Sequence, residues 1–266
     1  MSSDGQTPFD PHLGHYTWPD LRALQKESDL LLLPVGATEQ HGPALPVNTD
    51  SLIAEALAEA AAKEAGVLMA PVLTYSSSAA HTLQWPGTFA LKAETFIDTV
   101  VQLGQWALHS GWRKLLLVNA HAGNDAPLRV ALDHLRLEGV GRWQVGLVQA
   151  HSLNEEIAEA FYADAADYHA NQAEADLIRH LAPHLMAGEN LTDSDDPDRT
   201  RGLVFSYPVA QTSRNGTTGY PSRGNAQRGA QLFDQMKNAL RELIQRAQTE
   251  TPPVEGISSP VVPWNR

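Results

Sequence analysis

Short apolar runs alternate with longer amphipathic segments along most of this chain. Four runs have the length and continuous hydrophobicity of strands buried in a parallel sheet, namely 30–35, 67–73, 114–119 and 143–149. Five segments have the composition and apolar spacing of helices, namely 50–65, 92–110, 125–138, 174–185 and 226–248. Because strands and helices alternate, we predict an α/β fold, a three-layer α/β/α sandwich with a mostly parallel central sheet.

Length and composition predict a single folded domain. The chain has 266 residues, of which 42% are hydrophobic and 19% charged, as is typical of a globular protein and not of a disordered one. We therefore assign residues 1–266 to one domain, with a proline-rich tail at 251–266. This tail is expected to lie extended on the surface or to dock on a neighbouring subunit.

Charge and cysteine content exclude several classes of function. The chain carries 19 basic and 31 acidic residues, and its net charge of −12 argues against nucleic acid and anionic membranes as partners. The N-terminus is polar and no apolar run is long enough for a transmembrane helix, so we expect a cytoplasmic location. Because there is no cysteine, any metal ion must be held by His, Asp or Glu.

Acids and histidines follow the predicted strands, at the edge where parallel α/β sheets bind their ligands. Glu39 and His41 follow the first run, and residues two apart in extended backbone point to the same side. Asp50 starts the next helix, where it is either an N-cap or a carboxylate that bridges two cations. His121 follows the third run among small residues, which let a ligand approach closely.

A second acid and histidine pair lies at the start of a later helix. Glu174 is either a first-turn acid stabilised by the helix dipole or a metal ligand, and His169 is either a packing residue or a proton-transfer group. Together with the residues at the strand ends, this set of oxygen and nitrogen ligands suits zinc or manganese, and also iron or nickel. Two cations that share a carboxylate, about 3.5–4 Å apart, can activate one water molecule.

Five motifs in this sequence resemble the creatininase (creatinine amidohydrolase) family. The longest is PVGATEQHGPALPVNTD at 34–50, and the others are WPGT at 85–88, NAHAGN at 119–124, HANQAE at 169–174 and, more weakly, GTTGYP at 216–221. The resemblance spans about residues 15–248. It implies an α/β/α sandwich that holds two metal ions, and family members are commonly homo-oligomers, in particular hexamers.

The resemblance also implies the metal ligands. They are Glu39, His41, Asp50, His121 and Glu174. Asp50 would bridge the two ions, with Glu39 and His121 on one and His41 on the other. Creatininase takes the last carboxylate from the position of Gly123 here, so Glu174 is the candidate for that role.

Roles in catalysis follow from the same resemblance. His169 is implied as the acid–base group and Glu174 as its catalytic neighbour, while Trp85 and Asn124 are candidates for binding the substrate. The expected cofactors are two divalent cations, with zinc as the first choice and manganese or iron as alternatives. The sequence departs from the family pattern at 44, 120, 122, 171, 172, 175 and 176, which predicts a subfamily with its own substrate.

The function predicted in this way is metal-dependent hydrolysis of an amide-like C–N bond in a small molecule, such as a cyclic amide or a formamide. One alternative is a hydrolase that opens the ring of a keto-cyclitol or a lactone, because the same polarised carbonyl serves C–C or C–O cleavage. Another is a non-catalytic metal-binding assembly, against which an intact His169 argues. No Gly-x-Ser-x-Gly or Gly-x-Gly-x-x-Gly motif is present where a serine hydrolase or dinucleotide enzyme requires it.

Overall fold

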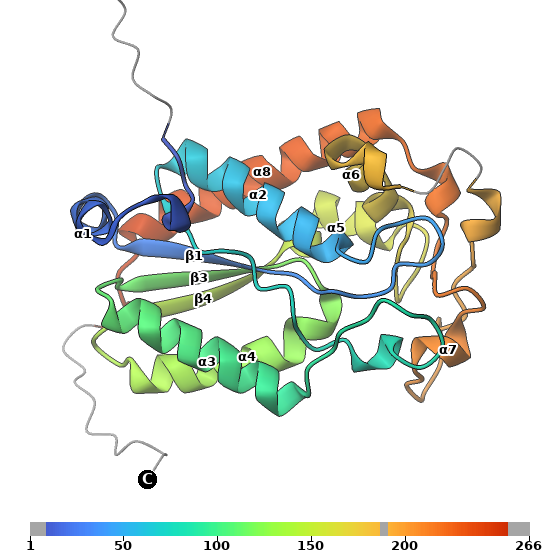
Figure 1. The fold of residues 1–266 in the computed structure, drawn as a ribbon, viewed down its shortest axis with the longest axis horizontal. Helices are drawn as coiled ribbons and strands as arrows, with labels where there is room; N and C mark the ends of the chain where they lie inside the picture. The colour runs from blue at the N-terminus through green and yellow to red at the C-terminus, as the bar shows by residue number, and fades with distance from the viewer. Residues whose placement is uncertain (1–8, 187–190, 255–266) are drawn as a thin grey trace, which may run out of the picture.

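The computed structural model describes residues 9–186 and 191–254 and contains one parallel sheet (Figure 1). Its four strands are β1 (Leu30–Val35), β2 (Leu68–Met69), β3 (Lys114–Asn119) and β4 (Gln144–Gln149). They lie in the order β2-β1-β3-β4 and all pairs are parallel, which confirms the predicted α/β class. Most of the predicted tail, 255–266, lies outside the described residues.

Helices cover both faces of the sheet, so the layers are those of an α/β/α sandwich (Figure 1). One face carries α2 (Thr49–Ala65), α6 (Gln172–Leu181) and α8 (Ala226–Thr249), and the other carries α3 (Ala93–His109) and α4 (Asp125–Glu138). Successive side chains of β1 point to opposite faces of the sheet and so contribute to a hydrophobic core on each face. Leu30 and Leu32 belong to the α2 side, whereas Leu31 and Leu33 belong to the α3 side.

Shorter elements complete the fold. The remaining helices are α1 (Trp18–Glu27), α5 (Glu155–Tyr162) and α7 (Val209–Thr212). The 3₁₀ turns are η1 (Leu13–His15), η2 (Ala79–His81), η3 (Ala122–Asn124), η4 (Ala150–Ser152), η5 (Pro183–Leu185), η6 (Thr192–Ser194) and η7 (Pro221–Arg223). In the described part of the chain, no helix combines the length and the apolar character needed to cross a membrane.

Two predicted elements end early, and a proline explains each difference. The run 67–73 forms a continuous ladder only at Leu68–Met69, because Pro71 has no N–H to donate to a neighbouring strand, and pairing with β1 resumes in a single bridge between Leu73 and Val35. The helix predicted over 174–185 ends at Leu181, because Pro183 forces the residue before it out of the helical region.

Close packing brings the start of α2 against the end of β1. A Cβ at Gly36 would overlap the backbone of Ser51, so only glycine allows this approach. The Ser51 hydroxyl donates to the Ala37 carbonyl at 2.8 Å and holds the contact. As a result, the first turn of α2 lies beside the loop that follows β1.

Candidate metal centre

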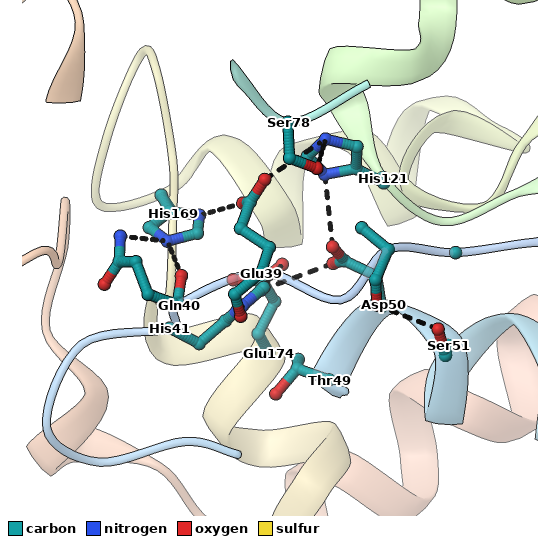
Figure 2. A network of polar contacts seen from close by, with 12 residues as sticks. Glu39, Gln40, His41, Thr49, Asp50, Ser51, Ser78, His121, His169 and Glu174 are labelled. Atoms are coloured by element: carbon teal, nitrogen blue, oxygen red, sulfur yellow. Dashed lines mark hydrogen bonds and ion pairs between the residues drawn. The ribbon is translucent and has the colours of Figure 1, made fainter. Parts of the chain in front are cut away.

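All five residues predicted as metal ligands meet at the carboxyl edge of the sheet (Figure 2). Each is at most 6% exposed; they are Glu39 and His41 in the loop after β1, Asp50 in the first turn of α2, His121 directly after β3, and Glu174 in the first turn of α6. The structure therefore brings together side chains from four separate segments. Charged groups are rarely buried in this way unless they are paired or bind a metal ion.

Asp50 joins the two halves of this cluster. Its Oδ1 lies 3.3 Å from Nε2 of His41, and its Oδ2 lies 3.1 Å from Nδ1 of His121 (Figure 2). The alternative role as an N-cap is wrong, because α2 begins at Thr49 and its N-cap residue is Asn48. Asp50 thus presents one oxygen to each histidine.

Two groups of three ligand atoms share Asp50. In each group the three atoms lie within 4.8 Å of one another, and the groups are Glu39–Asp50–His121 and His41–Asp50–Glu174. Oε2 of Glu39 lies 3.3 Å from Nε2 of His121, and Oε1 of Glu174 lies 3.9 Å from Nε2 of His41. The structure thus groups the same residues that the sequence resemblance implied for each ion, and their role as ligands stays a prediction.

Backbone contacts show that these atoms suit a cation. Nδ1 of His41 lies 3.0 Å from the carbonyl oxygen of Glu39, so it carries the proton and donates. Nε2 of His41 is then an acceptor that faces carboxylate oxygens. Among the described residues, this Nε2, Oδ2 of Asp50 and both carboxylate oxygens of Glu39 are buried without a hydrogen-bond partner. Acceptors that face acceptors are stabilised by a positive ion between them, and the oxygen and nitrogen donors fit zinc, manganese or iron.

The electrostatics of the centre are dominated by burial and by the mutual approach of acids and histidines. Burial raises the pKa of Glu39 to about 7, although nearby His121 and His41 oppose the shift. Burial lowers the pKa of His121, but Glu39 and Asp50 outweigh this effect and raise it to about 9. In the same way Asp50 and Glu174 raise the pKa of His41 well above its usual value. The site therefore favours positive charge, which a metal ion supplies without protonating the ligands.

His169 lies beside the ligands without joining either of the two sets. Its Nε2 donates to the carbonyl oxygen of Gln40 at 2.7 Å, and its Nδ1 lies 3.3 Å from Oε1 of Glu39. Burial holds the pKa of His169 well below its usual value. Its backbone pairs with Thr218 through an antiparallel bridge, which fixes the position of the ring. His169 is therefore a neutral imidazole whose unprotonated nitrogen, Nδ1, faces the Glu39 carboxylate.

Comparison with known proteins places this arrangement in a family. The sequence model described as "Creatininase: Creatinine amidohydrolase" matches residues 14–244. The chain belongs to the creatininase family. The resemblance that the sequence motifs indicated is thus confirmed, and the relatives in this family are hydrolases, among them an amidohydrolase, peptidases and a hydrolase of a cyclitol.

Named relatives differ in what they act on. The chain is 31% identical over 242 residues to a mycofactocin precursor peptide peptidase of Mycolicibacterium smegmatis, covering 86% of this chain and 90% of that protein. It is 26% identical over 282 residues to a 3-dehydro-scyllo-inosose hydrolase of Thermotoga maritima, covering 95% and 90%. Substrates therefore vary among creatininase relatives of similar distance.

Solved creatininase structures share the fold. One described as "Creatininase Mn" aligns with a TM-score of 0.76 and 24% identity, covering 91% of this chain and 100% of that chain. A creatininase mutant of "Zn-Zn type" aligns with a TM-score of 0.76 and 24% identity, covering 91% and 99%. The three-layer architecture of this chain is thus that of creatininase.

The two residues predicted to bind substrate have different surroundings. Asn124 is fully buried, and its Nδ2 donates to Gly36 O at 3.0 Å and to Asn119 Oδ1 at 3.1 Å, while its Oδ1 accepts from Ser77 N. These contacts hold Asn124 between the loops that follow β1 and β3, and its role in binding substrate stays a prediction. Trp85 is half-buried in the loop between η2 and α3, and its role in binding stays a prediction.

Three residues at the centre were not predicted from the sequence, namely Gln40, Ser78 and His81. Ser78 lies with its Oγ 3.3 Å from Nε2 of His121, and His81 lies with its Nδ1 3.4 Å from Oε1 of Glu39. Both follow the apolar run 67–73, so the rule that placed other site residues after the strands also applies to them. They were not predicted because β2 is short and a long loop separates it from Ser78 and His81.

Proposed function

We propose that this chain is a metal-dependent hydrolase that cleaves an amide-like C–N bond with two divalent cations, zinc by preference and manganese or iron as alternatives. The observation that carries the proposal is the buried carboxylate of Asp50, shared by two sets of ligands. A purely structural cluster has no need for three acids and two histidines with unpartnered acceptor atoms. The peptidase relative and the description of the family as creatinine amidohydrolase support C–N cleavage.

Each of the two ions would have its own ligands, with Asp50 shared between them. Glu39 and His121 would hold one ion with Asp50, and His41 and Glu174 would hold the other with Asp50. When bound, such a pair polarises a carbonyl and lowers the pKa of a water molecule. The rigid backbone contacts of His41 and the fixed start of α2 keep the ligand atoms in place before the substrate arrives.

Glu174 combines a structural and a functional contact. Its Oε2 accepts a hydrogen bond from Asn171 N at 3.2 Å and completes a capping box with the Asn171 side chain. Its other oxygen, Oε1, faces His41. The cap therefore fixes the carboxylate and directs its free oxygen to the centre.

His169 is assigned the transfer of the proton. Because Nε2 of His169 donates to the Gln40 carbonyl, Nδ1 is the atom that accepts a proton. We assign to Nδ1 the proton that leaves the attacking water and then reaches the departing nitrogen. Such acid–base groups typically contribute about 10²–10⁴-fold to the rate.

Metal content and turnover test the proposal together. The wild type, His121→Ala and His169→Ala would be prepared with excess metal, with His134→Ala as a control at an exposed histidine of α4. We expect two ions per chain in the wild type, in His169→Ala and in the control, and fewer in His121→Ala. Turnover would be assayed on cyclic amides, formamides and short peptides. Activity should survive only in the wild type and the control.

Two results of this experiment would reject the proposal. Equal and negligible metal content in the wild type and in His121→Ala would exclude a metal centre. Full turnover in His169→Ala would exclude the proton-transfer role of His169. If this variant instead binds metal normally and loses turnover, a non-catalytic metal-binding assembly is excluded.

Hydrolysis of a cyclitol ring is the second candidate. It is favoured by the 26% identity to a 3-dehydro-scyllo-inosose hydrolase over 95% of this chain. A panel of keto-cyclitols and lactones beside the amides separates the two functions. Ring opening of a cyclitol with no nitrogen release from any amide would replace the first proposal by the second.

A further inference from the structure

The Gln40 carboxamide has an orientation that backbone groups fix. Its Oε1 accepts from the backbone N–H of Gly42 at 3.0 Å, and its Nε2 donates to the carbonyl oxygen of Gly216 at 3.1 Å. Because a backbone N–H only donates and a carbonyl only accepts, the two ends of the amide cannot be exchanged. A Cβ at Gly216, where φ is +88°, would overlap Oε1 of Gln40, so this loop is shaped to seat the amide.

One proton of this amide remains after the bond to Gly216. Two imidazole nitrogens lie near Nε2 of Gln40, namely Nε2 of His169 at 3.1 Å and Nδ1 of His81 at 3.2 Å. Nε2 of His169 already donates to the Gln40 carbonyl at 2.7 Å and cannot accept a second proton. The remaining amide proton therefore goes to Nδ1 of His81.

This bond sets the tautomer of His81. A neutral imidazole that accepts at Nδ1 carries its proton on Nε2. The single lone pair of Nδ1 is used by Gln40, so it is not free to bind a cation, although Glu39, His81 and His169 together have the spacing of a metal site. His81 is instead a neutral donor with a fixed direction.

The donor end of His81 is accessible. Among the described residues, Nε2 of His81 has no hydrogen-bond partner, and the side chain keeps 13% of its surface exposed, against 0% for Glu39 and 7% for His121. The His81 ring centroid lies 4.2 Å from that of His169, the residue assigned to proton transfer. An unused N–H thus lies at the edge of the centre, next to the group that would protonate the departing nitrogen.

We propose that His81 binds the substrate through Nε2–H and stabilises the carbonyl oxygen that becomes negative when water attacks. This inference rests on the proposed amide hydrolysis and names a donor for its oxyanion. His81 keeps its proton throughout the reaction. Its hydrogen bond to the substrate oxygen strengthens as negative charge develops on that oxygen. Gln40 acts through His81 and is a positioning residue. Removing one such donor costs about 10²–10³-fold in kcat in other hydrolases.

Two variants at this position test the role in the metal-loaded protein. His81→Leu removes the donor, whereas His81→Gln restores an N–H at a similar distance from the backbone. We expect His81→Leu to hold the same metal per chain as the wild type and to lose about 10²–10³-fold in kcat with a smaller change in KM. His81→Gln should recover at least tenfold of this loss. Unchanged kcat in His81→Leu, or a loss of bound metal, would overturn the inference.

A neutron structure of the metal-loaded protein tests the tautomer without any assay. Deuterium should appear on Nε2 of His81 and not on Nδ1. Deuterium on Nδ1 would overturn the inference and leave the proposed function standing. If the wild type hydrolyses no amide, the proposed function fails, and the role of His81 as an oxyanion donor fails with it.

Discussion

Nε2 of His41 lies 3.3 Å from Oδ1 of Asp50, yet the proton of this imidazole is on the opposite nitrogen, where it binds the carbonyl of Glu39. Two acceptors therefore face each other in a buried site. Either a second proton on His41 or a metal ion resolves this contact, and the pKa of His41 is raised accordingly. The contact makes the centre a place where protons and metal ions compete.

Glu174→Gln should remove one ion and leave the other. The glutamine amide oxygen keeps the bond to Asn171 N, so the capping box and the helix remain. The charge that faces His41 is lost, and metal content should fall from two ions to one, with a loss of turnover. Elemental analysis checks this against Asp98→Asn, a control at an exposed acid of α3. Two retained ions in Glu174→Gln would exclude Glu174 as a ligand.

Metal affinity should rise with pH. The pKa of Glu39 is raised to about 7 and that of His121 to about 9, so at pH 6 both groups carry protons that a metal ion must displace. The apparent dissociation constant should fall about tenfold per pH unit for each displaced proton and level off above about pH 9. Competition with a chelator at pH 6 to 9 measures this slope. An affinity independent of pH would contradict the account.

Gly229→Ala should destabilise the fold at the contact between α6 and α8. A Cβ at Gly229 would overlap the carbonyl of Asp176, so the helices must move apart. We expect a loss of about 1–3 kcal/mol in the free energy of unfolding, measured by denaturant titration. Gly14→Ala is the matched control, because its Cβ would meet nothing within 4 Å. Equal stability of the two variants would show that this close approach is not required.

Much of the fold follows from local patterns in the sequence. The predicted boundaries of β1, β3 and α4 agree with the structure, because each has a continuous apolar run or a regular apolar face with a clear stop. Helix α5 was not predicted, although Asn154 caps it and acids fill its first turn. With only eight residues, α5 is too short for its apolar positions to show a clear helical periodicity in the sequence.

The ligands were easier to predict than their surroundings. Glu39, His41 and His121 directly follow strands, so the edge of the sheet places them together. The role of Gln40 depends on a contact with Gly216, which lies 176 residues away and leaves no local signal. His81 follows the apolar run 67–73, but the long loop between them separates it from the end of the strand.

Anomalous scattering from crystals grown with zinc or manganese tests the central claim most directly. The account predicts two peaks per chain on either side of the Asp50 carboxylate, one toward Glu39 and His121 and the other toward His41 and Glu174. No peak at Asp50 in metal-loaded crystals, or an ion that leaves Asp50 uncoordinated, would contradict it.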